Sequence, residues 1–178
     1  ALTGLLGNWL LQQWQQRNWL NQQRFLGEQK EYENLKELCE EIVALSGRRI
    51  TKMRRLLAIL PNADEKLIRR RLKAYDQELL KWNEKLGGFY VRLTFYAAYE
   101  MAGRLEREVQ DEFVATGRAL EGLTKSTLTG KIPTKCQTGQ VEAALNIVGA
   151  AIKNYNRDLL RVLEIQKTKT YYGKKIEL

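Results

Sequence analysis

Only two prolines, Pro61 and Pro133, interrupt this chain of 178 residues, and between them apolar residues recur at alternating spacings of three and four. That spacing places apolar side chains along one face of an α-helix, and its repetition over many turns is typical of helices that pack along their whole length. Because proline ends or kinks a helix, few prolines allow long helices. We therefore predict an all-α fold, an elongated antiparallel bundle of about four long helices with coiled-coil-like packing.

The first predicted helix carries an apolar seam over residues 32–60. Arg49 occupies the one charged position of this seam. Pro61 should end the helix, and Asn62 with Glu65 three residues later predicts a capping box for the next one. The sequence thus predicts a tight helical hairpin at this proline.

The second predicted helix carries its seam over residues 68–86, and the pair Gly87-Gly88 follows it. Because glycine readily adopts the left-handed conformation at a helix C-terminus, we expect the second helix to end at this pair. The third helix should then run over residues 89–125. Its predicted seam consists of Val91, Phe95, Ala98, Ala102, Leu105, Val109, Phe113, Leu120 and Leu123.

Turn-forming residues and Pro133 predict one long loop at residues 126–139, with Thr138 as the cap of the helix that follows. The seam of the fourth helix spans residues 141–162. Beyond it the sequence is polar and basic, and we expect this tail to fray. The predicted organisation is a Trp-rich helix at residues 1–27 that continues into the next helix, a helical bundle at residues 28–166, and a basic C-terminal tail at residues 167–178.

The sequence offers little for catalysis or metal binding. Histidine, the commonest general base and metal ligand, is absent. The two cysteines, Cys39 and Cys136, lie far apart and match no zinc or redox spacing. We therefore expect a non-enzymatic protein without metal, cofactor or small-molecule substrate.

Positive charge is concentrated in one stretch. The net charge is +9, and residues 48–73 alone contain ten basic and two acidic residues. Antiparallel packing would place this stretch at the proline hairpin, which suggests an anionic partner. The candidate residues for binding a phosphate or lipid headgroup are Arg48, Arg49, Lys52, Arg54, Arg55, Lys66, Arg69, Arg70, Arg71 and Lys73.

Two interpretations of this basic stretch remain open. Its side chains could contact phosphates of a nucleic acid or an anionic membrane. No sequence signature of a DNA- or RNA-reading module accompanies them, so nucleic-acid binding would involve backbone contacts without base readout. Alternatively, the arginines could form interhelical ion pairs with acidic residues of the third helix, namely Glu106, Glu108, Asp111 and Glu112.

The first 27 residues differ in composition from the rest. They contain no acidic residue, and Trp9, Trp14 and Trp19 stand among leucines and glutamines, with Arg17 and Arg24 as the charges. Tryptophan and arginine in this arrangement are typical of the cytoplasmic border of a membrane. The alternative is that the tryptophans pack on the bundle or on a second copy of it.

These features lead to a hypothesis about function. We expect a membrane-proximal or membrane-anchored scaffold or adaptor, cytoplasmic and at the inner face of a membrane, that assembles with itself or with a protein partner. The alternative is a helical bundle that binds nucleic-acid backbones through residues 48–73.

Overall fold

A computed structural model describes the backbone of residues 2–62 and 64–172, and the side chains of residues 11–62 and 64–172. These residues form helices and no strand, so the predicted all-α bundle is confirmed. The elements are α1 (Leu2–Leu57), a 3-10 turn (Leu60–Asn62), α2 (Glu65–Tyr96), α3 (Tyr99–Arg104), a π-helix (Leu105–Gln110), α4 (Asp111–Leu128) and α5 (Lys135–Tyr172).

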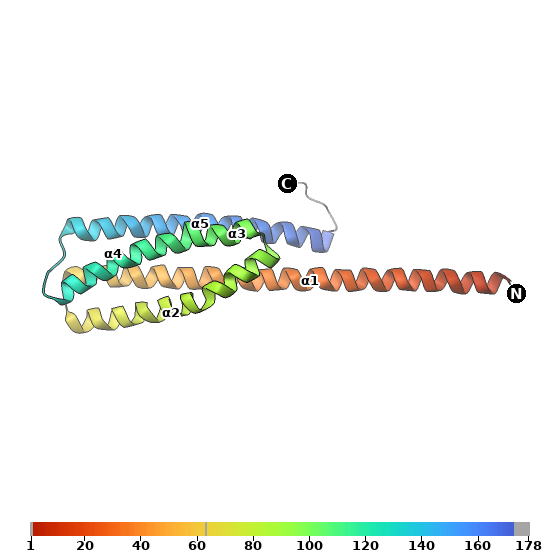
Figure 1. Cartoon of the computed structure of the whole chain (residues 1–178), viewed down its shortest axis with the longest axis horizontal. Coiled ribbons are helices and arrows are strands. Elements are labelled where there is room, and N and C mark those ends of the chain that lie inside the picture. The colour runs from red at the N-terminus through yellow and green to blue at the C-terminus, as the bar shows by residue number, and fades with distance from the viewer. Residues whose placement is uncertain (1, 63, 173–178) are drawn as a thin grey trace.

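The bundle consists of four antiparallel rods (Figure 1). α1, α2 and α5 form one rod each. α3, the π-helix and α4 follow one another without a turn and form the third rod in chain order. The α1–α2 turn and the α4–α5 loop lie at one end of the bundle, and the start of α1 and the end of α5 lie toward the other.

The predicted seams form a continuous core. In α1, Leu35, Ile42, Met53 and Leu56 are at most 1% exposed. Buried residues of the other rods lie against them and fill the space between the helices. They include Ile68, Tyr75 and Trp82 of α2, Leu105, Val109, Phe113 and Leu120 of the third rod, and Val141, Leu145, Val148, Tyr155 and Leu159 of α5.

The predicted end of the second helix is wrong. α2 runs through Gly87-Gly88 to Tyr96, and the turn occurs at Ala98, whose backbone is extended. Phe89 and Leu93, both fully buried, continue the apolar seam of α2 past the glycines. Burying two such side chains is worth about 1.5–3 kcal/mol each, which exceeds the roughly 1 kcal/mol that a glycine costs inside a helix.

This longer α2 changes the start of the third seam. Val91 and Phe95, predicted as core residues, lie on the outer face of α2 and are 54% and 81% exposed. Ala98 is also exposed, in the turn. The seam of the third rod begins instead at Met101 and Ala102, which are buried.

The predicted loop at residues 126–139 is shorter in the structure. α4 continues to Leu128, and Gly130 (φ 87°) occupies the left-handed conformation just after it. α5 begins at Lys135, so Thr138 lies inside the helix and is not its cap. Thr134 caps α5 instead, because its hydroxyl accepts a hydrogen bond from the Gln137 backbone and its own N–H donates to the Gln137 side chain.

Two further predictions about helix ends need correction. Asp64, not Asn62, caps α2, since its carboxylate accepts a hydrogen bond from the backbone N–H of Lys66. Residues 167–172 of the predicted frayed tail belong to α5, where Thr170 is buried. The remainder of that tail, residues 173–178, lies outside the described residues.

The glycine pair inside α2 generates a stability prediction. Apart from the chain neighbours and the backbone of α2 itself, no heavy atom lies within 4 Å of a Cβ placed at Gly87 or Gly88. Gly87→Ala and Gly88→Ala should therefore each raise the free energy of unfolding by about 0.5–1 kcal/mol, because alanine loses less backbone entropy in a helix. Urea denaturation monitored by circular dichroism measures this.

Gly117→Ala is the matched control for this prediction. A Cβ at Gly117 would lie 2.9 Å from the Tyr75 hydroxyl oxygen, so alanine there should destabilise the bundle. If Gly87→Ala and Gly88→Ala also destabilise, the helix does not run unbroken through the pair.

Candidate interaction surfaces

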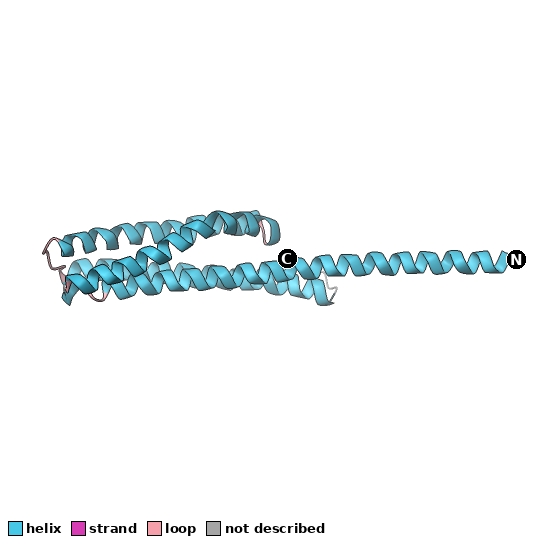
Figure 2. Ribbon diagram, turned by 90° about the horizontal axis from the view of Figure 1, so that it is seen from below, coloured by secondary structure: helices cyan, strands magenta, loops and turns pink. Residues whose placement is uncertain are grey.

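The N-terminal part of α1 projects alone beyond the bundle (Figures 1 and 2). We call residues 11–27, the projecting part with described side chains, the overhang. All of its residues are exposed, including Trp14 (62%) and Trp19 (58%). Arg17 and Arg24 are exposed as well. Trp9, the remaining candidate of this segment, lies outside the residues whose side chains are described.

The end of α5 marks where the overhang begins. The ring of Tyr171 contacts the rings of Phe25 and Tyr32 edge to face, with centroid distances of 6.2 and 5.8 Å. The Thr170 hydroxyl donates to the backbone carbonyl of Glu28 at 3.5 Å. On the N-terminal side of these contacts, no described part of the bundle covers α1.

Helical geometry places most large apolar side chains of the overhang on one side. At about 100° per residue, five of them fall within an arc of about 140°, and Arg17 and Arg24 lie on the opposite side. Leu20 is the exception, because it lies on the side of the arginines. The five side chains, which we call the apolar arc, are Leu11, Trp14, Trp19, Phe25 and Leu26.

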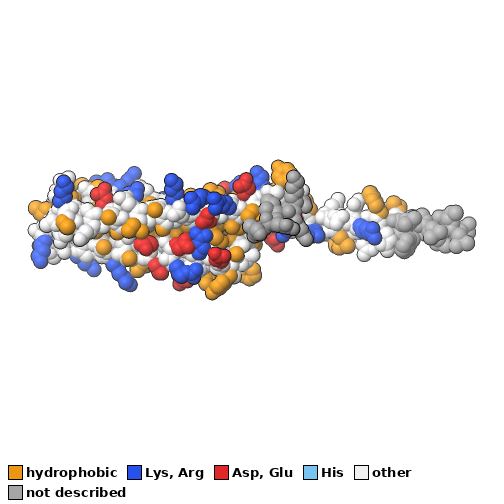
Figure 3. All heavy atoms as spheres, turned by 90° about the horizontal axis from the view of Figure 1, so that it is seen from above, with side chains coloured by type: hydrophobic (Ala, Val, Ile, Leu, Met, Phe, Trp, Pro, Cys, Tyr) orange, Lys and Arg blue, Asp and Glu red, His pale blue; other side chains and the backbone are white. Residues whose placement is uncertain are grey.

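The basic stretch, residues 48–73, lies around the α1–α2 turn, at the end of the bundle opposite the overhang. On the face drawn in Figure 3, Lys and Arg side chains predominate toward that end, and acidic side chains gather nearer the middle of the bundle. Nine of the ten predicted residues reach the surface. Seven are exposed, namely Arg48, Arg54, Arg55, Lys66, Arg69, Arg70 and Lys73, and two are half-buried, Lys52 and Arg71.

Arg49 is the tenth, and its prediction as a phosphate-binding residue is wrong. Its side chain is 1% exposed and lies inside the bundle. The guanidinium carbon lies 4.2 Å from the ring centroid of Phe113 and 5.8 Å from that of Trp82. No phosphate can reach it without opening the core.

A side-chain amide completes the surroundings of Arg49. Arg49 Nη1 donates to Gln110 Oε1 at 3.3 Å, and Trp82 Nε1 donates to the same oxygen at 2.7 Å. Gln110 is the last residue of the π-helix, a rare element that shifts the register of the side chains following it. Arg49 Nε has no hydrogen-bond partner among the described residues.

The cost of burying the charge of Arg49 and the contacts that offset this cost are similar in size. Burial lowers the pKa of Arg49, because removing a charge from water costs several kcal/mol. Cation–π contacts of about 2 kcal/mol each and a charged hydrogen bond of about 1.5–3 kcal/mol offset that cost. Arg49 therefore fills the core and contributes little net stability through its charge.

This balance predicts the outcome of two substitutions. Arg49→Ala should lower the free energy of unfolding by about 2–4 kcal/mol, because it leaves a cavity among aromatic rings. Arg49→Met, which keeps most of the volume, should change it by less than about 1.5 kcal/mol. Urea denaturation of both variants checks this, with the exposed Arg55→Ala as a control expected to stay within about 0.5 kcal/mol of the native protein. Equal losses in Arg49→Met and Arg49→Ala would contradict a space-filling role.

The predicted ion pairs with the third helix do not form. Glu108 pairs with Arg104, and in the described chain Glu106, Asp111 and Glu112 pair with none of the basic stretch. Two residues of the stretch have other carboxylate partners. Arg48 Nε lies 3.2 Å from Glu78 of α2, and Arg69 Nη2 lies 2.8 Å from Glu65.

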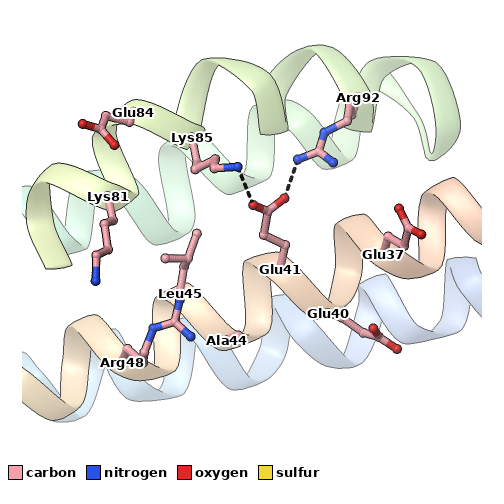
Figure 4. A pocket seen from close by; sticks show the side chains of 10 residues that line it. All are labelled: Glu37, Glu40, Glu41, Ala44, Leu45, Arg48, Lys81, Glu84, Lys85 and Arg92. Atoms are coloured by element: carbon pink, nitrogen blue, oxygen red, sulfur yellow. Dashed lines mark hydrogen bonds and ion pairs between the residues drawn. The ribbon is translucent and has the colours of Figure 1, made fainter.

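A groove of about 580 Å³ lies on the surface of the bundle between α1 and α2 (Figure 4). Arg48 and Lys81 line the end nearer the α1–α2 turn. Glu37, Glu40 and Glu41 line the other end, where Glu41 pairs with Lys85 at 3.0 Å and with Arg92 at 2.6 Å, whereas Glu84 lies toward the Lys81 end. Sequence reasoning missed this groove, because its lining combines two helices whose relative register only the folded core determines.

The Glu41 pairs generate a pH prediction. The hydrogen bond from Arg92, followed by contacts with Lys85, lowers the pKa of Glu41 below its ordinary value. A lowered folded-state pKa contributes stability above the unfolded-state pKa, and this contribution is lost as the pH falls through the folded-state value. Glu41→Gln should therefore cost about 1 kcal/mol at pH 7 and progressively less below about pH 4.5.

Urea denaturation between pH 3 and 7 measures this difference. Glu37→Gln, which removes a carboxylate that forms no ion pair in the described chain, is the control. If the loss of unfolding free energy in Glu41→Gln stays constant over this pH range, the ion pairs of Glu41 do not stabilise the fold as predicted.

Both cysteines are free thiols, so neither forms a disulfide in the chain. Cys39 is buried, and burial raises the pKa of its thiol to about 11. Cys136 is exposed near the start of α5. Among the described residues, no group of three or more acidic or cysteine side chains is arranged to hold a metal ion.

None of the described helices has a stretch both long and apolar enough to cross a bilayer. Comparison of the chain with protein-family models, with curated proteins and with solved structures finds no match.

Proposed function

We propose that this chain is a non-enzymatic scaffold or adaptor that works at a membrane surface, with the overhang of α1 as the segment that contacts the membrane. The observation that carries this proposal is the apolar arc, whose side chains are exposed on the projecting part of α1, with Phe25 touching Tyr171 of α5 where the arc meets the bundle. A stable helix hides such an arc against protein or lipid.

The composition of the overhang favours a membrane interface. Trp14 and Trp19 each combine a large apolar ring with an N–H group, a combination that is favourable at the level of lipid headgroups. Arg17 and Arg24 lie away from the apolar arc, where they could reach anionic headgroups while the arc is buried. Each large apolar side chain that leaves water contributes about 1.5–3 kcal/mol, so a few suffice for binding.

The bundle would serve as the part that holds protein partners or a second copy of the chain. Support comes from a second group of exposed apolar side chains near the α2–α3 turn. Phe95 and Tyr99 are 81% and 70% exposed, and Val91 precedes Phe95 by one helical turn. This group lies at the end of the bundle nearer the overhang. A cytoplasmic location at the inner membrane face is part of the same proposal.

Flotation with lipid vesicles tests the membrane contact. The whole chain should float with vesicles of phosphatidylcholine and phosphatidylserine in a density gradient. Trp14→Gln combined with Trp19→Gln should reduce the floating fraction at least about tenfold, because it removes two buried rings worth about 1.5–3 kcal/mol each.

Phe95→Gln combined with Tyr99→Gln is the matched control, since it removes two exposed aromatic rings from the bundle instead. The control should float like the native chain. No flotation of the native chain, or an equal loss in both double variants, would overturn the membrane contact.

A further inference from the structure

The basic end of the groove continues beyond the groove itself. Lys52 and Arg55 follow Arg48 by four and seven residues, so all three lie on one face of α1. Arg70 precedes Lys81 by eleven residues, about three helical turns, and shares its face of α2. Since Arg48 and Lys81 line the groove, these two faces form a line of positive side chains from the groove toward the α1–α2 turn.

We call these five residues, Arg48, Lys52, Arg55, Arg70 and Lys81, the basic track, and we propose that the basic track binds the phosphate backbone of a nucleic acid. The proposal is independent of the function proposed for the overhang, because the basic track lies toward the opposite end of the bundle.

Few carboxylates neutralise the basic track. Glu78 lies 3.2 Å from both Arg48 and Lys81, so one negative charge is shared between two cations. Lys52, Arg55 and Arg70 form no ion pair within the described chain. Uncompensated positive side chains held this close repel one another, and a bound polyanion relieves that repulsion.

The fold adds positive charge that lies far away in the sequence. The α4–α5 loop lies at the same end of the bundle as the α1–α2 turn (Figure 1). The loop carries the exposed Lys131, and two further exposed lysines flank it, Lys125 in the last turn of α4 and Lys135 at the start of α5. These residues extend the positive field around the end of the track and strengthen the attraction for a long anion over a short one.

A membrane fits the basic track less well. Arg55 and Trp19 are 36 residues apart on the same helix, which corresponds to about 54 Å at 1.5 Å per residue. Headgroups bound by the overhang therefore lie several Debye lengths, each about 8 Å, from Arg55 along α1 and do not interact with its charge.

An acidic protein also fits the basic track less well. Interfaces between proteins are usually anchored by a few tryptophan, tyrosine and arginine side chains in well-packed pockets that exclude water. In the groove, Leu45 is buried and the other described lining side chains are Ala44 and charged residues. Contact with a phosphate backbone, which depends mainly on charge, needs no such anchor, and arginine matches phosphate geometry well.

Fluorescence anisotropy with a labelled 20-base-pair DNA duplex and a labelled 20-nucleotide RNA tests this on the whole chain. Five cations and one shared carboxylate correspond to about four phosphate contacts, so the slope of log K against log salt for the duplex should be about −3 to −4. Arg55→Glu combined with Arg70→Glu should weaken binding more than tenfold at 50 mM salt.

The matched control is Lys153→Glu combined with Lys169→Glu, which reverses two exposed charges on α5 and gives the same net charge. It should bind within about twofold of the native chain. Circular dichroism verifies that each variant is folded, and Arg55→Gln with Arg70→Gln replaces the reversal if its helix content falls.

Three results would overturn the proposal: no binding of either nucleic acid at 50 mM salt, an equal loss in both double variants, or binding to anionic vesicles that requires Arg55 and Arg70 without any binding to DNA or RNA. Failure of the flotation experiment alone would leave it intact.

Discussion

Burial of the apolar seam of α1 against the other rods determines most of this structure. Leu35, Ile42, Met53 and Leu56 leave water only because α2 and α5 run alongside α1. α1 is much longer than these partners, so its covered part ends where the last turn of α5 packs on Phe25 and Tyr32. The exposed apolar arc follows directly from that difference in length, because a helix without neighbours has nothing in the chain to cover it.

The sequence was sufficient to predict the apolar seams of the helices. It was insufficient to predict helix ends at places where the seam continues past residues that usually stop a helix. Spacing alone located many buried positions of α1 and α5, such as Leu35, Ile42, Leu145 and Tyr155. It misplaced the end of α2, because the pair Gly87-Gly88 is a strong local stop signal, whereas Phe89 and Leu93 gain their burial only in the assembled bundle. The α4–α5 loop shows the same effect, since α4 continues through residues that are common in turns.

The candidate surfaces, too, could be predicted from the sequence only in part. Composition identified the overhang and the basic stretch, but it could not separate Arg49 from its neighbours. That separation depends on Trp82, Phe113 and Gln110, which come from two other rods and from a π-helix that no spacing pattern predicted. The groove between α1 and α2 was equally inaccessible to sequence reasoning, because it requires the register of Arg48 against Lys81. The molecule thus carries an apolar surface on the overhang and a basic surface at the opposite end of the bundle.

Hydrogen–deuterium exchange along α1 tests the dependence of this architecture on the seam most directly. Backbone amides of a helix without tertiary support open far more readily than those of a packed core. In the free protein, amides of residues 11–27 should exchange rapidly, and those of residues 35–56 should exchange slowly. Vesicles should slow exchange in residues 11–27 alone. Equal protection along the whole of α1 in the free protein would contradict the account, because it would mean that the overhang is already covered.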